Sequence, residues 1–172
     1  STPYALEPNC KESPGGLRDL RNILWICRAG NLGDSWNDLA RRDYITRGEA
    51  LQLKELENFL RHVRIRLHWL TGRREDRLLF DHQEAIAGQF GIAASKTRRA
   101  SEQLMQRYYK TAKSVTQLNT ILLQNLGAEI FPEANKAPIV INDRFQSDRE
   151  LLDIRAEDVF EKTPSAILES FL

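Results

Sequence analysis

Apolar residues recur at three- and four-residue intervals along most of the chain, the spacing that places side chains on one face of an α-helix. The longest such stretch begins at Ser95 and ends at Gly127, with no proline between them and with apolar positions at Leu104, Tyr108, Val115, Leu118, Leu122 and Leu126. A second long stretch ends at Gly72 and carries Leu53, Leu56, Phe59, Leu60, Val63, Leu67 and Leu70. These periods predict an all-α fold, an antiparallel helical bundle with the Ser95–Leu126 helix as its spine.

Capping signals set the expected helix boundaries. Ser13-Pro14 is typical of a helix start and predicts a first helix to about Cys27. Asp34 or Ser35 is expected to cap a short helix through Arg41. The capping-box pairs Thr46/Glu49 and Asp81/Glu84 predict two more helices, which Gly72 and Gly91 would end.

The C-terminal part has a different pattern. Apolar runs at 139–141 and 151–154 flank a polar turn and predict a small β-hairpin, and Thr163-Pro164 predicts a last helix. Because that helix is still apolar at Leu172, we expect a further domain to follow. The predicted organisation is therefore an extended entry segment (1–13), a helical bundle (14–128), and a hairpin with a terminal helix (129–172).

Composition narrows the class of protein. A net charge of +1 over 172 residues gives no general reason to expect nucleic-acid or membrane binding, and no apolar run is long enough to span a bilayer. The first residues lack a secretory signal pattern, and the two cysteines, Cys10 and Cys27, are expected to be reduced thiols of a cytoplasmic protein. Basic residues nevertheless cluster in 61–77 and in 95–114, which favours an anionic partner on one face.

The strongest local signal is the segment 8–19, PNCKESPGGLRD. Glycine costs roughly 1 kcal/mol in a helix interior, yet Gly15 and Gly16 would let a ligand approach the backbone. Free amides and the helix dipole favour an anion at a helix start, where Lys11 and Arg18 add positive charge. The alternative is a tight loop-to-helix turn with surface charges. The spacing does not match a P-loop.

Other candidate contacts to nucleotide or phosphate each have a structural alternative. Arg73, Arg74 and Arg77 could clamp phosphate, or Glu75 and Asp76 could neutralise them. Tyr109, at the edge of the apolar stripe, is a candidate base contact, whereas Tyr108 is expected in the core. Lys110 and Lys113 lie on a basic stripe that is either a binding face or a solvated one. Asp19 is a weak metal candidate and a better helix-start carboxylate, and the histidines are expected to be packed or solvated.

Three segments, 8–19, 72–83 and 105–113, together with 141–145 and 160–164, resemble bacterial protein-PII uridylyltransferases. The resemblance covers nearly the whole chain. Cys10, Ser13 and the stretch 27–30 depart from the usual family residues, which affects only details.

The resemblance implies an enzyme of nitrogen regulation that uses Mg²⁺, transfers UMP from UTP to a tyrosine of the PII signal protein, and removes it when glutamine is high. A polymerase-β-like catalytic domain would precede this chain, and HD and ACT domains would follow it. The chain itself contains no Gly-Ser with paired aspartates and no His-Asp dyad. The fragment alone is therefore expected to bind no metal and to be inactive, and its role would be to close over the nucleotide and help position PII.

Two other functions stay open from the sequence. One is the helical domain of a glutamine synthetase adenylyltransferase-like enzyme, which shares a glycine-rich helix start. The other is a stand-alone helical module whose basic face binds an acidic protein.

Overall fold

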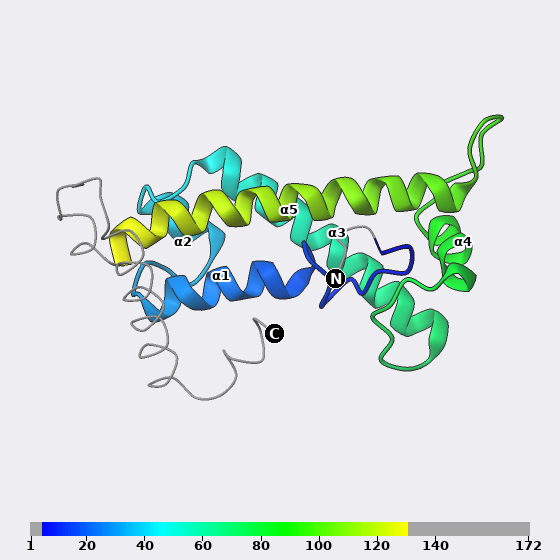
Figure 1. The fold of residues 1–172 in the computed structure, drawn as a ribbon, viewed down its shortest axis with the longest axis horizontal. Coiled ribbons are helices and arrows are strands. Elements are labelled where there is room, and N and C mark those ends of the chain that lie inside the picture. The colour runs from blue at the N-terminus through cyan, green and yellow to red at the C-terminus, as the bar shows by residue number, and fades with distance from the viewer. Residues whose placement is uncertain (1–4, 131–172) are drawn as a thin grey trace, which may run out of the picture. The chain divides into compact units, whose positions relative to one another are not determined.

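Five α-helices make up the part of the chain that the computed structural model describes, residues 5–130 (Figure 1). They are α1 (Leu17–Ala29), α2 (Trp36–Arg41), α3 (Arg47–Thr71), α4 (Phe80–Gln89) and α5 (Ala100–Ile130). Within these residues there is no strand, only an isolated antiparallel bridge between Asn9 and Arg77. The all-α prediction is confirmed for this region. The hairpin and terminal helix predicted in 129–172 lie outside the described residues.

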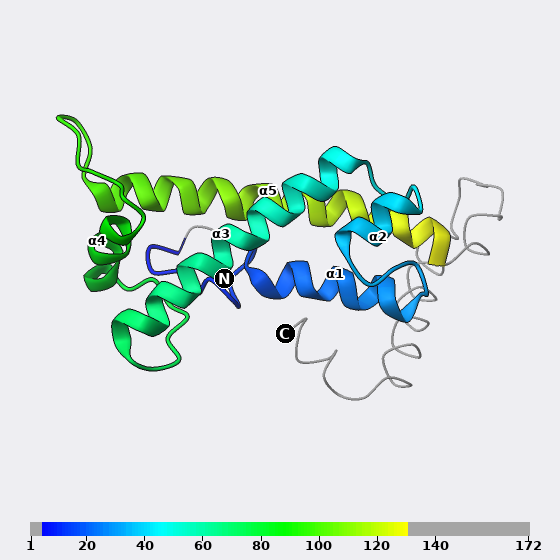
Figure 2. The same ribbon diagram turned by 180° about the vertical axis from the view of Figure 1, so that it is seen from behind.

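The longest helix, α5, forms one side of the core. Figures 1 and 2 show α1 lying alongside α5, while α3 runs obliquely to α5 and α4 packs at the beginning of α5. Between them lie fully buried side chains from three helices: Leu20 and Ile23 of α1, Leu53, Leu60, Val63 and Leu67 of α3, and Leu104, Tyr108 and Leu126 of α5. The prediction that Tyr108 belongs to the core is confirmed.

Several predicted features recur in the structure. Thr46 and Glu49 form both bonds of a capping box, Glu49 N to Thr46 Oγ1 at 3.1 Å and Thr46 N to Glu49 Oε2 at 2.8 Å. Ser35 caps α2, and Gly72 ends α3 in the left-handed conformation at φ 63°. Cys10 and Cys27 are buried free thiols, as expected. None of the five described helices has both the length and the apolar character needed to cross a bilayer.

Three predicted helix starts are wrong. The first helix begins at Leu17, three residues after Pro14, because Gly15 has φ +77° and leaves the helical region. Helix α4 begins at Phe80 without a side-chain cap of its own, so the predicted Asp81/Glu84 capping box does not form. Helix α5 begins at Ala100, because Ser95 instead closes a turn by accepting the Arg98 amide at 3.0 Å. At its other end α5 continues past Gly127 to Ile130.

Candidate functional site

The N-terminal segment 5–16 brings the three sequence motifs together. Leu78 N donates to Pro8 O at 2.8 Å, and Cys10 N donates to Asp76 O at 2.7 Å, on either side of the Asn9–Arg77 bridge. The segment is therefore docked along the 72–83 motif by backbone hydrogen bonds.

Side chains extend this docking to α4 and α5. Gln83 is only 5% exposed, and its amide donates to Leu6 O at 3.1 Å and to Leu78 O at 3.0 Å. The Tyr109 hydroxyl donates to Ala5 O at 2.9 Å. Tyr109 was predicted as a base contact. In this structure its hydroxyl holds the N-terminal segment against α5.

Close backbone packing explains both glycines of the 8–19 motif, at Gly15 against α5 and at Gly16 within the turn itself. A Cβ atom at Gly15 would lie 2.2 Å from Ala112 O, and one at Gly16 would lie 2.8 Å from Ser13 O. Neither position has space for a side chain, and the left-handed Gly15 would be strained with one. The close backbone approach that the sequence suggested for a ligand is made by the protein's own helix.

Backbone amides at the start of α1 are already bonded within the chain. Their acceptors are Asp19 Oδ2 for Gly15 (2.6 Å), Ser13 O for Gly16 (2.8 Å), Cys10 O for Leu17 (3.0 Å) and Lys11 O for Arg18 (2.9 Å). An anion at this turn would therefore meet side-chain cations rather than free amides.

Asp19 lies where the helix-start interpretation placed it. Burial raises the pKa of its carboxyl, against the smaller effects of the Gly15 amide and the Arg18 charge, which lower it. In residues 5–130 no three His, Cys, Asp or Glu side chains come close enough together to hold a metal ion. Asp19 thus acts as the carboxylate that closes the glycine turn.

The two cations of the 8–19 motif share one carboxylate. Lys11 Nζ lies 3.3 Å from Glu12 Oε1, and Arg18 Nη1 lies 2.6 Å from Glu12 Oε2. Asn9 Oδ1 accepts the amides of Lys11 and Glu12 at 2.9 and 2.8 Å and so fixes the turn that carries them. Sequence reasoning missed Glu12 and Asn9, although an Asn followed by a tight turn is a recognisable signal.

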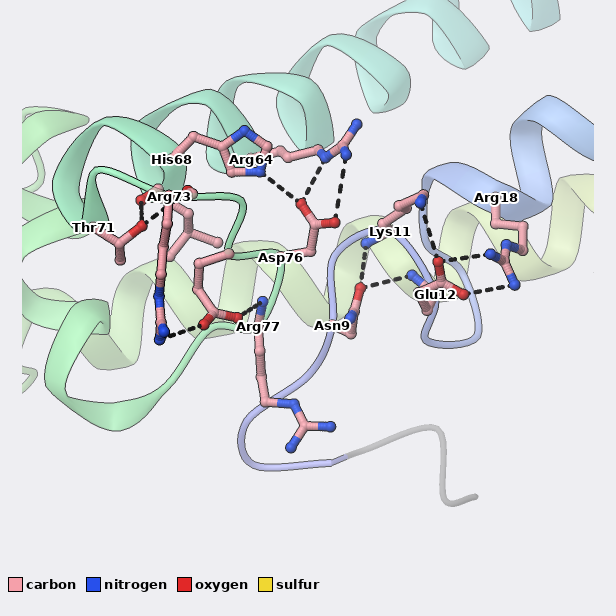
Figure 3. Close-up of polar contacts among 12 residues, drawn as sticks. Asn9, Lys11, Glu12, Arg18, Arg64, His68, Thr71, Arg73, Asp76 and Arg77 are labelled. Carbon is pink, nitrogen blue, oxygen red and sulfur yellow. Dashed lines mark hydrogen bonds and ion pairs between the residues drawn. The ribbon is translucent and has the colours of Figure 1, made fainter.

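A second cluster ties the 72–83 motif to α3. Arg64 Nε and His68 Nε2 lie 2.6 and 2.9 Å from Asp76 Oδ1 (Figure 3). Burial alone would raise the pKa of Asp76, but hydrogen bonds from Arg64 and His68 outweigh it, and the net pKa is lowered. This cluster was not predicted, although Arg64 and His68 share one helix face at a spacing of four residues.

The arginines of the 72–83 motif differ in their surroundings. Arg73 Nη2 lies 3.2 Å from Glu75 Oε2, so one predicted neutralisation is present. Arg74 and Arg77 are exposed and form no ion pair with any residue in the described range. In Figure 3 the Arg77 guanidinium points away from the hydrogen-bonded network.

Lys110 and Lys113 occupy the exposed side of α5, one on each side of the buried pair Thr111 and Ala112. Neither lysine has an ion-pair partner among residues 5–130. Gly15 packs against Ala112, and Lys113 is the next residue of α5 after Ala112. The cations left without carboxylates in this region are thus Arg74, Arg77, Lys110 and Lys113.

Comparison with known proteins identifies clear relatives. A family model described as GlnD PII-uridylyltransferase matches residues 1–123. A bifunctional uridylyltransferase/uridylyl-removing enzyme from Aromatoleum aromaticum is 66% identical over 99% of this chain and 20% of its own length. Proteins with the same description from Nitrosospira multiformis and Bordetella pertussis are 57% and 54% identical over 99% of the chain and 19% and 20% of their own lengths. The chain thus spans about a fifth of these curated relatives. No solved structure matches.

Proposed function

This chain belongs to the PII-uridylyltransferase family, and from that premise we propose that it is the helical, substrate-side part of a bifunctional uridylyltransferase/uridylyl-removing enzyme of nitrogen regulation. In this proposal the whole enzyme transfers UMP from UTP to the PII signal protein and removes it again, with catalytic, HD and ACT domains elsewhere in the same polypeptide. The described helices help to position UTP and PII. The family match supports this function over an adenylyltransferase domain or a stand-alone interaction module.

One observation carries the positional part of the proposal. Segments 72–83 and 105–113 are far apart in sequence, yet both contact the N-terminal segment, which carries most of the 8–19 motif. These two segments also carry the exposed cations Arg74, Arg77, Lys110 and Lys113. Such cations attract polyanions such as a nucleoside triphosphate or an acidic protein face over roughly 8–10 Å at ordinary salt.

The other predicted site residues enter the proposal with different weight. Lys11 and Arg18 are paired with Glu12, and Arg73 is paired with Glu75, so these three cations carry less weight. Gly15 acts by holding the turn against α5, Gly16 acts by keeping the turn itself tight, and Tyr109 acts by anchoring the N-terminal segment.

We further propose that the 172-residue chain alone neither transfers nor removes UMP. It contains neither Gly-Ser with paired aspartates nor a His-Asp dyad, and its described residues do not fit the Mg²⁺ expected in the whole enzyme. Incubation of the purified chain with UTP, Mg²⁺ and PII should leave PII unlabelled. Labelled UMP on PII would contradict this.

The positioning role is tested in the full-length enzyme with Arg77→Ala, Lys110→Ala and Lys113→Ala. We expect each variant to raise the KM for UTP or PII about two- to tenfold at low salt, with a smaller effect at high salt and an unchanged melting temperature. Arg47→Ala, which removes an exposed charge at the start of α3, is the matched control. Wild-type KM values for all three variants at low salt would refute the role.

A further inference from the structure

A groove of about 280 Å³ lies between α1 and α3, and none of Arg74, Arg77, Lys110 and Lys113 lines it. Its polar lining consists of Arg21 and Arg28 from α1 and of Glu57, Arg61 and Arg64 from α3. Trp25 adds an aromatic wall. Four guanidinium groups against one carboxylate are an unusual concentration in a chain whose net charge is +1.

The ion pairs of these arginines leave many donors unused. Arg64 uses Nε and Nη2 on Asp76, Arg61 uses Nη2 on Glu57, and Arg28 uses Nε on Asp34. A guanidinium carries five N–H donors, so each of the three keeps several for a ligand. Arg21 is exposed and has no carboxylate partner within the described residues. Three of the four lining arginines are thus paired with a carboxylate, and the groove offers the unpaired Arg21 together with the remaining donors of the other three.

Glu57 is held in place from the opposite side. Its Oε2 atom accepts from Trp36 Nε1 at 3.2 Å, while its Oε1 atom accepts from Arg61 Nη2 at 2.8 Å. Its side chain is only 19% exposed. This carboxylate therefore lines the groove with both of its oxygens already bonded, one to Trp36 and one to Arg61.

The apolar lining indicates more than a simple anion site. Trp25 is 41% exposed, and Leu17 and Leu24 line the groove with it. An exposed indole beside arginines suits a ligand that joins a planar ring to a phosphate, because the ring stacks on the indole while guanidinium groups bind phosphate in a bidentate manner.

We propose that the α1–α3 groove binds a nucleoside phosphate, with its base against Trp25 and its phosphate between Arg21 and Arg61. Stacking tolerates any base, so the class of ligand is a nucleotide rather than one particular base. The volume of about 280 Å³ is just below the roughly 300–1,000 Å³ of small-molecule pockets, so the ligand should be no larger than a mononucleotide. The proposal does not depend on the positioning role proposed for Arg77, Lys110 and Lys113, because none of them lines the groove.

The test is titration of the 172-residue chain with AMP and with UMP. Calorimetry measures the affinity, and NMR of the tryptophan indole resonances locates the binding site. We expect both nucleotides to shift the Trp25 indole signal and not that of Trp69, which is 84% exposed on another part of α3. Adenosine and inorganic phosphate should each bind at least about tenfold more weakly than AMP, because each makes only one kind of contact.

Variants locate the site. Arg21→Glu should weaken AMP binding by at least about tenfold, and Trp25→Leu should reduce it to the level of phosphate. Arg47→Glu makes the same charge change at the far N-terminal end of α3 and should bind as the wild type does. Circular dichroism should show that all three variants are folded.

Three results would overturn the proposal. Equal affinity for phosphate and AMP would make the groove an anion site without a nucleoside component. Unchanged AMP binding by the folded Arg21→Glu variant, or a shift of Trp69 in place of Trp25, would show that nucleotide does not bind in this groove.

Discussion

Gly15 shows how a single residue can be required by a contact that is distant in sequence. Its amide is taken by Asp19, its φ is +77°, and its Cα faces the backbone of Ala112 on α5. The sequence indicated that two adjacent glycines permit a close approach. It did not indicate the approaching group, because nothing near Gly15 in the chain identifies Ala112.

Gly15→Ala is expected to lower the free energy of unfolding by about 3 kcal/mol or more. A left-handed alanine is strained, and its Cβ would lie 2.2 Å from Ala112 O, so the turn or α5 must shift. Urea denaturation measures the change. Gly88→Ala in α4, where a Cβ meets nothing within 4 Å, is the control and should gain up to about 1 kcal/mol. Equal behaviour of the two variants would disprove the packing role.

Asp76 provides a pH-dependent contribution to stability. Since hydrogen bonds from Arg64 and His68 lower its folded-state pKa below the ordinary 3.8, its contribution is present above pH 3.8 and is lost as the pH falls through the lowered pKa. Asp76→Asn should therefore destabilise the chain at neutral pH, and the difference from wild type should shrink in acid. Thermal unfolding at several pH values measures this. Asp43→Asn, exposed and away from this cluster, should show no such trend.

At the scale of the helix, boundaries set by neighbouring residues were predictable and boundaries set by distant ones were not. Ser35, Thr46 and Gly72 act within one turn, and each was found from its local pattern. Helix α4 begins where Glu7 Oε1 accepts the Phe80 amide at 2.9 Å, from 73 residues away. No local sequence pattern predicts a cap from so distant a residue. The capping of α4 was therefore assigned to Asp81 and Glu84, whereas Glu7 provides the acceptor.

Thr46→Ala should cost about 1 kcal/mol, because it leaves the Glu49 amide at the start of α3 without its side-chain acceptor. Thr46→Ser keeps the acceptor oxygen and should stay within a few tenths of a kcal/mol of wild type. Chemical denaturation of both variants measures the difference. A serine variant as unstable as the alanine variant would show that the hydroxyl bond is not what stabilises this helix end.

At the scale of the whole molecule, the sequence identified the segments that form the candidate site, but it did not predict the contacts between them. The 8–19, 72–83 and 105–113 segments were singled out, and the structure joins them through the N-terminal segment. Their junction depends on Pro8, Gln83 and Tyr109, whose partners are main-chain groups. Main-chain pairing across a fold leaves little trace in side-chain periodicity, so these contacts could not be predicted.

Gln83→Leu is expected to cost about 2 kcal/mol, because it leaves the carbonyls of Leu6 and Leu78 without their donor in a buried site. Hydrogen exchange of the amides in 76–80 and of Cys10 should accelerate as well, which measures loosening of the N-terminal segment. Gln89→Leu, at the exposed end of α4, is the control and should alter neither quantity. Unchanged hydrogen exchange in Gln83→Leu would show that the Gln83 side chain does not hold the N-terminal segment in place.

The docking of the N-terminal segment also constrains the order in which the chain can be assembled. Residues 5–10 leave the ribosome before every group they bind, and Ala5 waits for a partner 104 residues later, Tyr109. Closing so long a loop costs conformational entropy, which the contacts made by the folded helices must offset. Contacts of α1 with α3 and of α2 with α3 join residues that are nearer to each other in the chain than Ala5 and Tyr109 are. Docking of residues 5–10 can therefore be completed only after α5 has been synthesised as far as Tyr109.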